Sequence, residues 1–341
     1  MYASIVLITR KTAIEELSAL FNTKAQAKFC LDQFDLQMGE TKPRSFHRYN
    51  IQHDNYQSSL DGLLKRLPAG MKYQLIDRSF LSNFTFSPDQ LIVTLGQDGL
   101  VVNTAKYLHD QPILAFNPDP ENIDGVLLPF ETSRAEWYFE LALSNSLPVK
   151  DICMAKAELS DGQTLHAFND LFIGMKNHTS ARYRIQLGEK SEDQCSSGVI
   201  VSTGAGSTGW LQSIVNGSFH IVNFFENKSG KRNSHRSGAN SEGMTCKFDW
   251  SDEMLYFSVR EPFKSRTSQI GITFGQVEGK DRMKITSQMS ENGVIFSDGM
   301  ESDFLTFNAG MTASIGVSEK KAKIFLNPLS GLFRKENNHE R

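Results

Sequence analysis

The sequence predicts an α/β domain with a Rossmann-like parallel sheet, followed by a β-rich, sandwich-like domain. Strand-like runs alternate with helical patterns over the first 148 residues, and such alternation favours a parallel sheet covered by helices. From Val149 onward, short extended runs are separated by turn signals, which is typical of a layered antiparallel domain. With 341 residues, the chain is long enough for two domains of ordinary size.

The first domain is expected over residues 1–148, with the C-terminal end, 320–341, as a candidate addition. Residues 40–58 are polar without a periodic apolar face, so we expect a loop there. The other expected elements, in order, are strand Ser4–Thr9, helices Thr12–Phe21, Ala25–Gln37 and Leu60–Leu67, strand Lys72–Asp77, a strand from Leu91 with a helix that ends near Leu108, and strand Pro112–Phe116.

The second domain is expected over residues 149–326. One short helix, Trp210–Val215, interrupts its strands, and His220–Phe225 is strand-like. Segment 226–245 carries lysines and arginines spaced by Gly, Ser and Asn, and is either a solvated insertion or a basic flap that closes over phosphates. The expected strands are 149–159, 164–174, 181–189, 195–203, 253–260, 268–277, 281–289, 292–297 and 311–326.

Composition and charge argue against several classes of protein. The net charge of −3 gives no electrostatic basis for nonspecific nucleic-acid binding. The four cysteines show no CxxC pair, so reduced thiols are expected rather than a disulfide framework. No apolar run has the length of a membrane span, and the opening SIVLITRKT is too short for a signal-peptide core. We therefore expect a soluble cytoplasmic protein without nucleic-acid or membrane partners.

The most informative stretch is LIVTLGQDGLVVNTAKYL, residues 91–108. A buried strand runs into Gly96 and an amphipathic helix follows, which is the arrangement of a phosphate-binding turn. Gly96 and Gly99 allow positive φ and close approach of an anion, and they flank one carboxylate, Asp98. The alternative is an ordinary turn in which Asp98 is the N-cap. In a parallel sheet, this turn and Asn117–Asp119 would both lie at the carboxyl ends of the strands, where ligands bind.

A second glycine loop, VIVSTGAGSTGW at 199–210, permits two interpretations. Gly204, Gly206 and Gly209 match the GxGxxG fingerprint of a nicotinamide-dependent dehydrogenase, with Glu226 at about the distance of a ribose-binding acid. The region after the loop is β-rich without alternating helices, which counts against this interpretation. In the other interpretation, the loop recognises adenine and ribose through hydroxyl groups and an aromatic face, from Ser202, Thr203, Ser207, Thr208 and Trp210. Plain core packing is the alternative role for Trp210.

Asn169 and Asp170 interrupt an otherwise apolar run, AFNDLFIG at 167–174. A polar pair there must be hydrogen-bonded, and ribose hydroxyls, a structural turn or a cross-strand bond would each satisfy it. No HExxH, HxH or Cys/His cluster occurs, so no metal ligands are assigned. GxSxG and GxxxxGK[ST] are also absent from the sequence, so any phosphoryl transfer would rely on backbone amides, a divalent ion and the acid.

Taken together, these motifs resemble those of the NAD kinase family over roughly residues 90–326 and in the same order. GQDG (96–99) resembles the family's GGDG loop, FND (168–170) its asparagine–acid pair, and STGAGSTGW (202–210) its TPTGSTAY segment. The chain is particularly similar to the branch that contains the mitochondrial NAD kinases. NPDPENIDGVLLPF (117–130) lies where the family has a loop after the next strand, and REPF (260–263) resembles a proline-containing stretch of the family. SDGMESDFLTFNAGMTASIGVS (297–318) resembles its closing region, a DG pair followed by a strand.

The resemblance implies transfer of the γ-phosphoryl group of ATP, with a divalent cation such as Mg²⁺, to the 2′-hydroxyl of the adenosine ribose of NAD. It implies an ATP- and phosphate-binding α/β domain and an NAD-binding β-rich domain, in a homodimer or larger homo-oligomer. Asp98 would be the catalytic general base, and the turn formed by Gly96, Gln97 and Gly99 would hold the ATP phosphates. The other implied nucleotide contacts are Asn117, Asn169, Asp170, Ser207, Thr208, Gly209, Trp210 and Ser213.

Several positions depart from the family pattern. Gln97 replaces the second glycine of GGDG, and Leu100 replaces a threonine. Gly204 replaces a proline, and Gly209–Trp210 replace an alanine and a tyrosine. The Gln97 side chain either blocks close approach of phosphate or donates a replacement hydrogen bond from its amide. Diacylglycerol and sphingosine kinases share the GGDG feature and a similar fold, so a different hydroxyl acceptor is an alternative, as is a silent NAD-binding protein.

Overall fold

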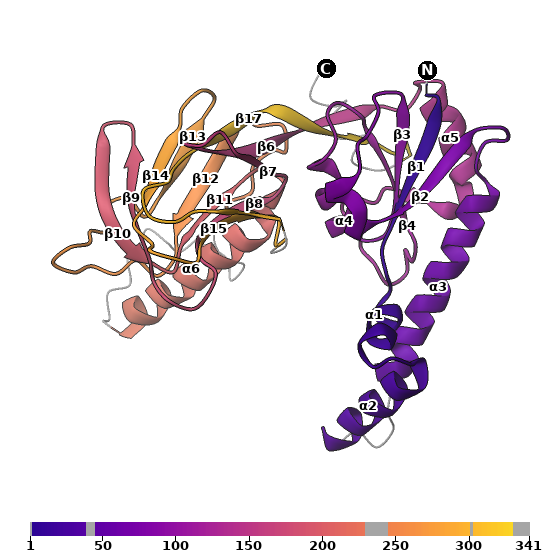
Figure 1. Ribbon diagram of the computed structural model, residues 1–341, viewed down its shortest axis with the longest axis horizontal. Coiled ribbons are helices and arrows are strands. Elements are labelled where there is room, and N and C mark those ends of the chain that lie inside the picture. Colours follow the sequence, from indigo (N-terminus) through magenta and orange to yellow (C-terminus); the bar gives the residue numbers. More distant parts are fainter. Residues whose placement is uncertain (1, 39–44, 229–244, 301–302, 330–341) are drawn as a thin grey trace. The chain divides into compact units, whose positions relative to one another are not determined.

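The computed structural model describes residues 2–38, 45–228, 245–300 and 303–329 (Figure 1). The chain forms two compact units: unit 1 comprises Met1–Lys150 and Lys323–Arg341, and unit 2 comprises Asp151–Ala322. The chain passes from one unit to the other within β6 (Val149–Leu159) and again within β17 (Thr312–Phe325). None of the described helices is both long and apolar enough to cross a bilayer.

Unit 1 is built on a parallel sheet whose strands run in the order β2-β1-β3-β4. These strands are β1 (Ser4–Thr9), β2 (Lys72–Asp77), β3 (Gln90–Leu95) and β4 (Ile113–Asn117). The short strand β5 (Phe130–Glu131) and the end of β17 pair with β4, also in parallel. The predicted α/β class and parallel sheet are confirmed.

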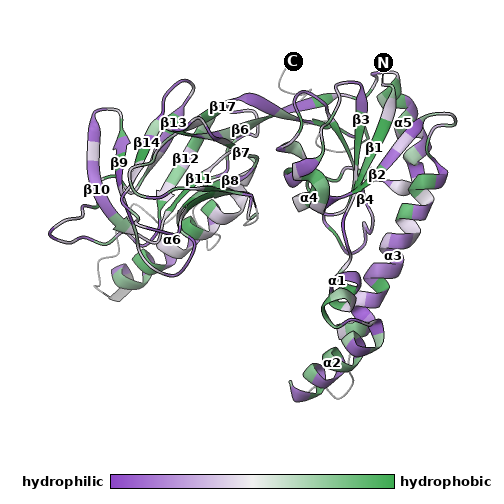
Figure 2. Ribbon diagram, viewed as in Figure 1, coloured by the Kyte–Doolittle hydropathy of each residue, from purple (hydrophilic) through white to green (hydrophobic). Residues whose placement is uncertain are grey.

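Helices cover both faces of this sheet, which explains why β1, β3 and β4 are almost continuously apolar (Figure 2). Figure 1 shows α4 (Asp98–Ala105) on one face and α3 (Ser45–Lys65) with α5 (Ala135–Leu143) on the other. Every second side chain of these strands packs on the face that α3 and α5 cover. Leu7, Val93 and Phe116 are on this face and are fully buried. The remaining helical elements are α1 (Ala13–Leu20), α2 (Lys24–Gln37), η1 (Arg78–Asn83) and η2 (Thr132–Arg134).

The expected loop at 40–58 is wrong from Ser45 onward, because α3 begins there; residues 39–44 lie outside the described part of the chain. Only Tyr56 and Leu63 of α3 are buried. This spacing gives a narrow apolar face, which is too sparse to produce a periodic pattern. The helix start is held by Asp35, whose carboxylate accepts from the Ser45 backbone N–H at 2.8 Å and hydroxyl at 2.6 Å. Helix α5 had no counterpart among the expected elements.

Unit 2 contains two antiparallel sheets that pack on a shared core, as the sandwich-like prediction expects. One sheet has the order β10-β9-β14-β17, with β6 beside β17 and β7 beside β6; the other has the order β13-β12-β11-β8-β15-β16. The core joins Tyr183 of β9 to Ile173 of β8 and Phe257 of β12. The strands not yet given are β7 (Thr164–Ala167), β8 (Asp170–Met175), β9 (Ala181–Leu187), β10 (Lys190–Ser196), β11 (Val199–Ser202), β12 (Met254–Val259), β13 (Phe274–Glu278), β14 (Met283–Ser287), β15 (Gly293–Ser297) and β16 (Phe304–Thr306).

Two strand predictions in unit 2 join segments that the structure separates. The run 164–174 is broken at 168–169, and 195–203 is split into the end of β10 and β11. Gly198 lies at the second break with a φ of 106°, a conformation that favours glycine. The run 268–277 is extended only from Phe274 onward.

The helix predicted at Trp210–Val215 is longer than expected, and the strand-like run His220–Phe225 is wrong because α6 (Trp210–Lys228) continues through it. Its β-branched and aromatic residues mimic a strand, but Phe224 and Phe225 remain exposed. At its other end, Trp210 and Ile214 pack on Phe172 of the second sheet. The predicted basic flap or insertion, 226–245, lies outside the described residues from 229 to 244.

Candidate phosphate turn and hydroxyl-binding turn

In unit 1 the carboxyl ends of three neighbouring strands bring the predicted phosphate turn together with two further segments. Because Ile8 pairs with Thr94 and Leu95 pairs with Phe116, the residues after β1, β3 and β4 lie at one edge of the sheet. Arg10 follows β1, the glycine turn follows β3, and β4 ends at Asn117. This edge is where ligands bind in parallel α/β sheets.

The glycine turn leads directly into α4. Gln97 is the N-cap without a side-chain capping bond, and Asp98 is the first helical residue, so the alternative of Asp98 as N-cap is wrong. The turn does not use positive φ, because neither Gly96 nor Gly99 has it. A Cβ at Gly99 would find no atom within 4 Å, whereas one at Gly96 would lie 2.8 Å from the Leu100 side chain. The backbone at Gly99 is therefore open to a ligand.

The Asp98 carboxylate is half-buried and fixed by the loop that follows β4. It accepts hydrogen bonds from the backbone N–H groups of Val126 at 3.1 Å and Leu127 at 2.9 Å. Gly125, with a φ of 58°, turns the chain just before these two donors. The carboxylate is thus held in one orientation, with an acceptor site left on each oxygen.

Asn117 shapes the same loop. It is 5% exposed, its Oδ1 accepts from the Asp119 N–H at 3.0 Å, and its Nδ2 donates to the Ile123 carbonyl at 2.8 Å. The side chain thus has two partners within the loop, and its contact with a nucleotide stays a prediction. The Asp119 carboxylate in turn accepts from the amides of Asn55 and Asn122.

Arg10 is a site residue that sequence reasoning missed. Its guanidinium donates to Oε1 of Gln97, and its backbone N–H donates to the Tyr56 hydroxyl at 3.1 Å. That hydroxyl donates to the Leu95 carbonyl at 3.1 Å, so Tyr56 ties the ends of β1 and β3 together. Burial raises the pKa of Tyr56 to about 12, and the nearby Arg10 acts in the opposite direction. The sequence did contain one signal for Arg10, namely a cationic residue directly after the first predicted strand, at the edge of the sheet where ligands bind.

In unit 2 three segments meet at the turn that carries Asn169 and Asp170. The Asp298 carboxylate accepts from the backbone N–H groups of Phe168 at 3.0 Å, Asn169 at 2.7 Å and Asp170 at 3.2 Å. Asp298 itself has a φ of 56°, which costs a non-glycine residue energy. From the other side, the Thr203 N–H donates to the Asn169 carbonyl at 2.9 Å. Asp298, which lies in the family-like segment 297–318 but was given no role from the sequence, therefore determines the shape of this turn.

The Asp170 side chain is poorly solvated. Burial raises the pKa of its carboxyl to about 7, the Asp298 carboxylate adds to this rise, and the Ser202 hydroxyl opposes it. Its Oδ1 is buried and has no hydrogen-bond partner among the described residues. A buried oxygen without a partner is costly, and a ligand hydroxyl would satisfy it. The Ser297 hydroxyl is in the same situation.

The GAGSTG loop does not form a dinucleotide-binding unit. Strand β11, which leads into it, pairs antiparallel with both β8 and β12, whereas the dehydrogenase interpretation requires a parallel βαβ unit. A Cβ at Gly204 would lie 2.0 Å from the Asp249 carbonyl oxygen, and one at Gly206 would lie 2.3 Å from that of Asn169. These glycines are needed for backbone packing.

The predicted adenine-contacting residues differ in exposure. Ser207 is fully buried and its hydroxyl donates to the Gly204 carbonyl at 2.7 Å. Thr208, Gly209 and Ser213 are exposed. Trp210 is half-buried, stacks on Phe172 with ring centroids 6.0 Å apart, and has the Arg260 guanidinium 5.4 Å from its ring centroid. Core packing therefore accounts for much of the Trp210 side chain.

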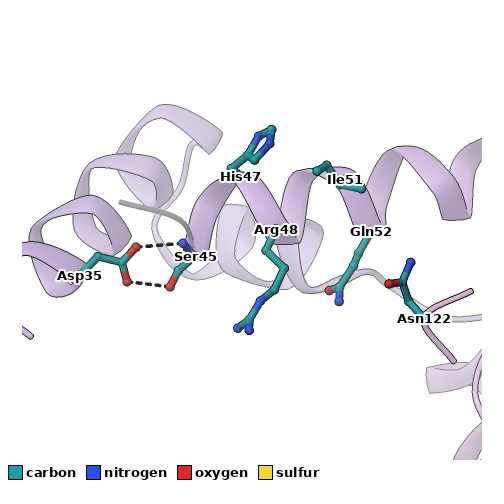
Figure 3. A pocket seen from close by; sticks show the side chains of 7 residues that line it. All are labelled: Asp35, Ser45, His47, Arg48, Ile51, Gln52 and Asn122. Carbon is teal, nitrogen blue, oxygen red and sulfur yellow. Dashed lines mark hydrogen bonds between the residues drawn. The ribbon is translucent and has the colours of Figure 1, made fainter. Parts of the chain in front are cut away.

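A separate cavity of about 650 Å³ is lined by α2, α3 and the loop after β4 (Figure 3). In this view the Arg48 and Gln52 side chains point to the same side of α3, toward which Asn122 also lies. None of the predicted site residues lines this cavity. Within the described ranges, no group of three or more His, Cys, Asp or Glu side chains is arranged to hold a metal ion.

No protein-family model matches the chain, and no curated protein sequence matches it. Solved structures that are similar to this chain include two that cover nearly its whole length. The NAD kinase from Archaeoglobus fulgidus in complex with ATP is 16% identical, with a TM-score of 0.55 over 98% of this chain and 97% of that one. Yeast NADH kinase complexed with NADH is 13% identical, with a TM-score of 0.57 over 99% of this chain and 87% of that one. The chain therefore has the fold of these NAD and NADH kinases.

Proposed function

We propose that this chain is an NAD kinase, which transfers the γ-phosphoryl group of ATP to the 2′-hydroxyl of the adenosine ribose of NAD. The main support is Asp98, a half-buried carboxylate in an open glycine turn at the carboxyl end of β3, in a fold shared with an ATP-bound NAD kinase. The ordered motifs of the sequence support the same activity. We further propose that the enzyme is cytoplasmic, forms a homodimer or a larger homo-oligomer, and is similar to the branch of the family that contains the mitochondrial NAD kinases.

Asp98 is the general base in this proposal. It takes the proton of the 2′-hydroxyl as the 2′-oxygen forms a bond to the γ-phosphorus, and the bond from that phosphorus to the β–γ bridging oxygen breaks to release ADP. The two backbone donors at 126 and 127 fix the carboxylate, and the remaining acceptor site on each oxygen is available to the hydroxyl. Backbone amides of the turn and the start of α4 favour the phosphate charge.

Unit 2 supplies the proposed contacts with NAD. Asn169 and the carboxyl of Asp170 bind ribose hydroxyls, and the buried Asp170 Oδ1, which has no hydrogen-bond partner among the described residues, would gain one from such a bond. The exposed Thr208, Gly209 and Ser213 line the adenine pocket with Trp210, while the buried Ser207 supports the loop.

A divalent ion accompanies the nucleotide in this proposal. The described residues include no cage of three acidic, His or Cys ligands. Mg²⁺ is commonly held by substrate phosphates with one or two carboxylates, so such a cage is not required. When bound, the ion neutralises phosphate charge.

The test is NADP formation from ATP, magnesium and NAD by the wild type and by Asp98→Asn, detected with an NADP-specific coupled enzyme. The isosteric variant keeps one acceptor oxygen for the two backbone donors of the loop, places an amide NH₂ where the other oxygen was, and loses basicity, so we expect kcat to fall by about 100-fold or more. Asp89→Asn is the matched control, because this exposed carboxylate lies just before the opposite end of β3.

Each outcome has a distinct meaning. Wild-type rates in Asp98→Asn would reject the assignment of the base. A wild type that binds NAD in calorimetry but forms no NADP would favour a different hydroxyl acceptor, of the lipid-kinase kind, or a silent NAD-binding protein.

A further inference from the structure

A small cavity of about 110 Å³ lies over the glycine turn of unit 1. It is lined by residues from the ends of β1 and β3, from α3 and from the loop after β4, including Gly96, Gln97 and Tyr56. Drug-sized ligand pockets measure roughly 300 Å³ or more, so this cavity suits a single charged group rather than a nucleoside. Among its lining residues, Arg10 is the one cation and Asp119 the one acid.

The Arg10 side chain lies across the glycine turn. Its Cδ is 3.5 Å from the position that a Cβ would take at Gly96, and its guanidinium donates to Gln97 Oε1. The backbone of Arg10 is anchored independently through Tyr56, which is 6% exposed. The guanidinium is therefore positioned by a rigid strand end on one side and by the glutamine on the other.

The charge of Arg10 is not neutralised by Gln97. Gln97 is a neutral amide, and it uses one of several guanidinium N–H donors. The Asp119 carboxylate, the acid in the same cavity, accepts hydrogen bonds from Asn55 and Asn122. A positive group with donors to spare thus lies over a turn whose backbone is open at Gly99.

We propose that Arg10 binds the terminal phosphate oxygens of the phosphoryl donor, and that Gln97 positions the Arg10 guanidinium for this contact. Arginine matches phosphate geometry with parallel N–H donors. In this proposal the Gln97 side chain orients the Arg10 guanidinium and does not block the approach of phosphate to the turn. The inference rests on the proposed function in taking the ligand to be a nucleoside triphosphate, but the contact itself requires only a phosphate chain.

The test uses inorganic tripolyphosphate as the probe, with calorimetry on the full chain, beside adenosine as an uncharged probe. Arg10→Ala should weaken tripolyphosphate binding by about 10-fold or more, since it removes charge-assisted hydrogen bonds. Arg10→Lys should keep part of the affinity, because lysine retains the positive charge but lacks the parallel N–H donors of arginine. Arg78→Ala is the matched control: Arg78 directly follows the neighbouring strand β2, is exposed, and does not line the cavity.

Gln97→Glu provides a second variant that does not depend on removing the arginine. A carboxylate of the same shape would pair with Arg10, so we expect weaker tripolyphosphate binding, whereas Gln97→Ala should have a smaller effect. In the enzyme assay, Arg10→Ala should raise the KM for ATP more than it lowers kcat for NADP formation. Thermal unfolding would establish that each variant is folded.

Unchanged tripolyphosphate affinity in Arg10→Ala, an equal loss in Arg78→Ala, or no binding by the wild type would overturn the assignment. A wild type that binds tripolyphosphate through Arg10 but forms no NADP would leave this inference intact and reject the proposed function. The two failures are therefore distinguishable.

Discussion

The two glycine-rich segments of this chain use the same residue type for opposite purposes. In unit 1, a Cβ at Gly99 would meet nothing within 4 Å, so the missing side chain leaves the backbone accessible. In unit 2, Cβ atoms at Gly204 and Gly206 would lie 2.0 and 2.3 Å from carbonyl oxygens of other segments. A glycine motif therefore signals either access for a ligand or close packing of backbone, and the sequence pattern does not distinguish the two.

The largest effect is expected where a glycine is packed against backbone. Gly206→Ala would force a methyl group into the Asn169 carbonyl, and neither backbone segment can yield as a flexible side chain would. We expect the free energy of unfolding to fall by about 3 kcal/mol or more, measured by urea denaturation. Gly217→Ala, at a helical position with open space around its Cβ, is the control and should be neutral or stabilising. Equal stability of both variants would refute the packing role.

The second effect is a pH dependence that originates in unit 2. In the folded protein the pKa of Asp170 is about 7, whereas its reference value is 3.8. The folded state thus binds more protons than the unfolded state between these values, so this group's contribution to stability is lost as pH rises from about 4 to about 7. The loss should amount to a few kcal/mol. Asp170→Asn should remove it in urea unfolding series across this range; a wild-type pH slope in the variant would reject the assignment.

A smaller change in stability is expected at Asp298, where two variants separate the loss of the carboxylate from the unfavourable backbone φ. Asp298→Ala removes the acceptor of three backbone N–H bonds and keeps the unfavourable positive φ. We expect it to cost about 2 to 3 kcal/mol of stability. Asp298→Gly loses the same bonds but relieves the φ, so it should be more stable than the alanine variant by about 1 kcal/mol. Thermal or urea unfolding of the pair measures the difference, and a less stable glycine variant would contradict this account.

The smallest stability effect is expected at the open turn. Gly99→Ala introduces no clash and places alanine in the first turn of α4, so stability should change by no more than about 1 kcal/mol. NADP formation should nevertheless fall several-fold, because the methyl group would project into the space assigned to phosphate. Full activity together with unchanged stability would show that this space is not used by the ligand.

Much of the fold could be predicted because its signals are local. Apolar runs next to turn residues predict β1, β3 and β4, and alternation with helices predicts a parallel sheet. Short runs with turn signals indicated the antiparallel sheets of unit 2. The prediction failed at α3, because this helix is polar over most of its length. It is held to the sheet by a contact between residues far apart in the sequence, in which the Tyr56 hydroxyl donates to the Leu95 carbonyl.

Local sequence patterns predict the fold class, the positions of most strands, and the motif order that motivates the proposed roles of Asp98, Asn169 and Asp170; those roles stay predictions. Only the tertiary structure brought Arg10 beside Gln97, and Asp298 beneath a turn some 130 residues earlier in the chain. Such pairs are set by strand register and sheet packing, which no local pattern encodes. The same reason explains the two uses of glycine, because access and packing depend on which distant backbone lies opposite each Cα.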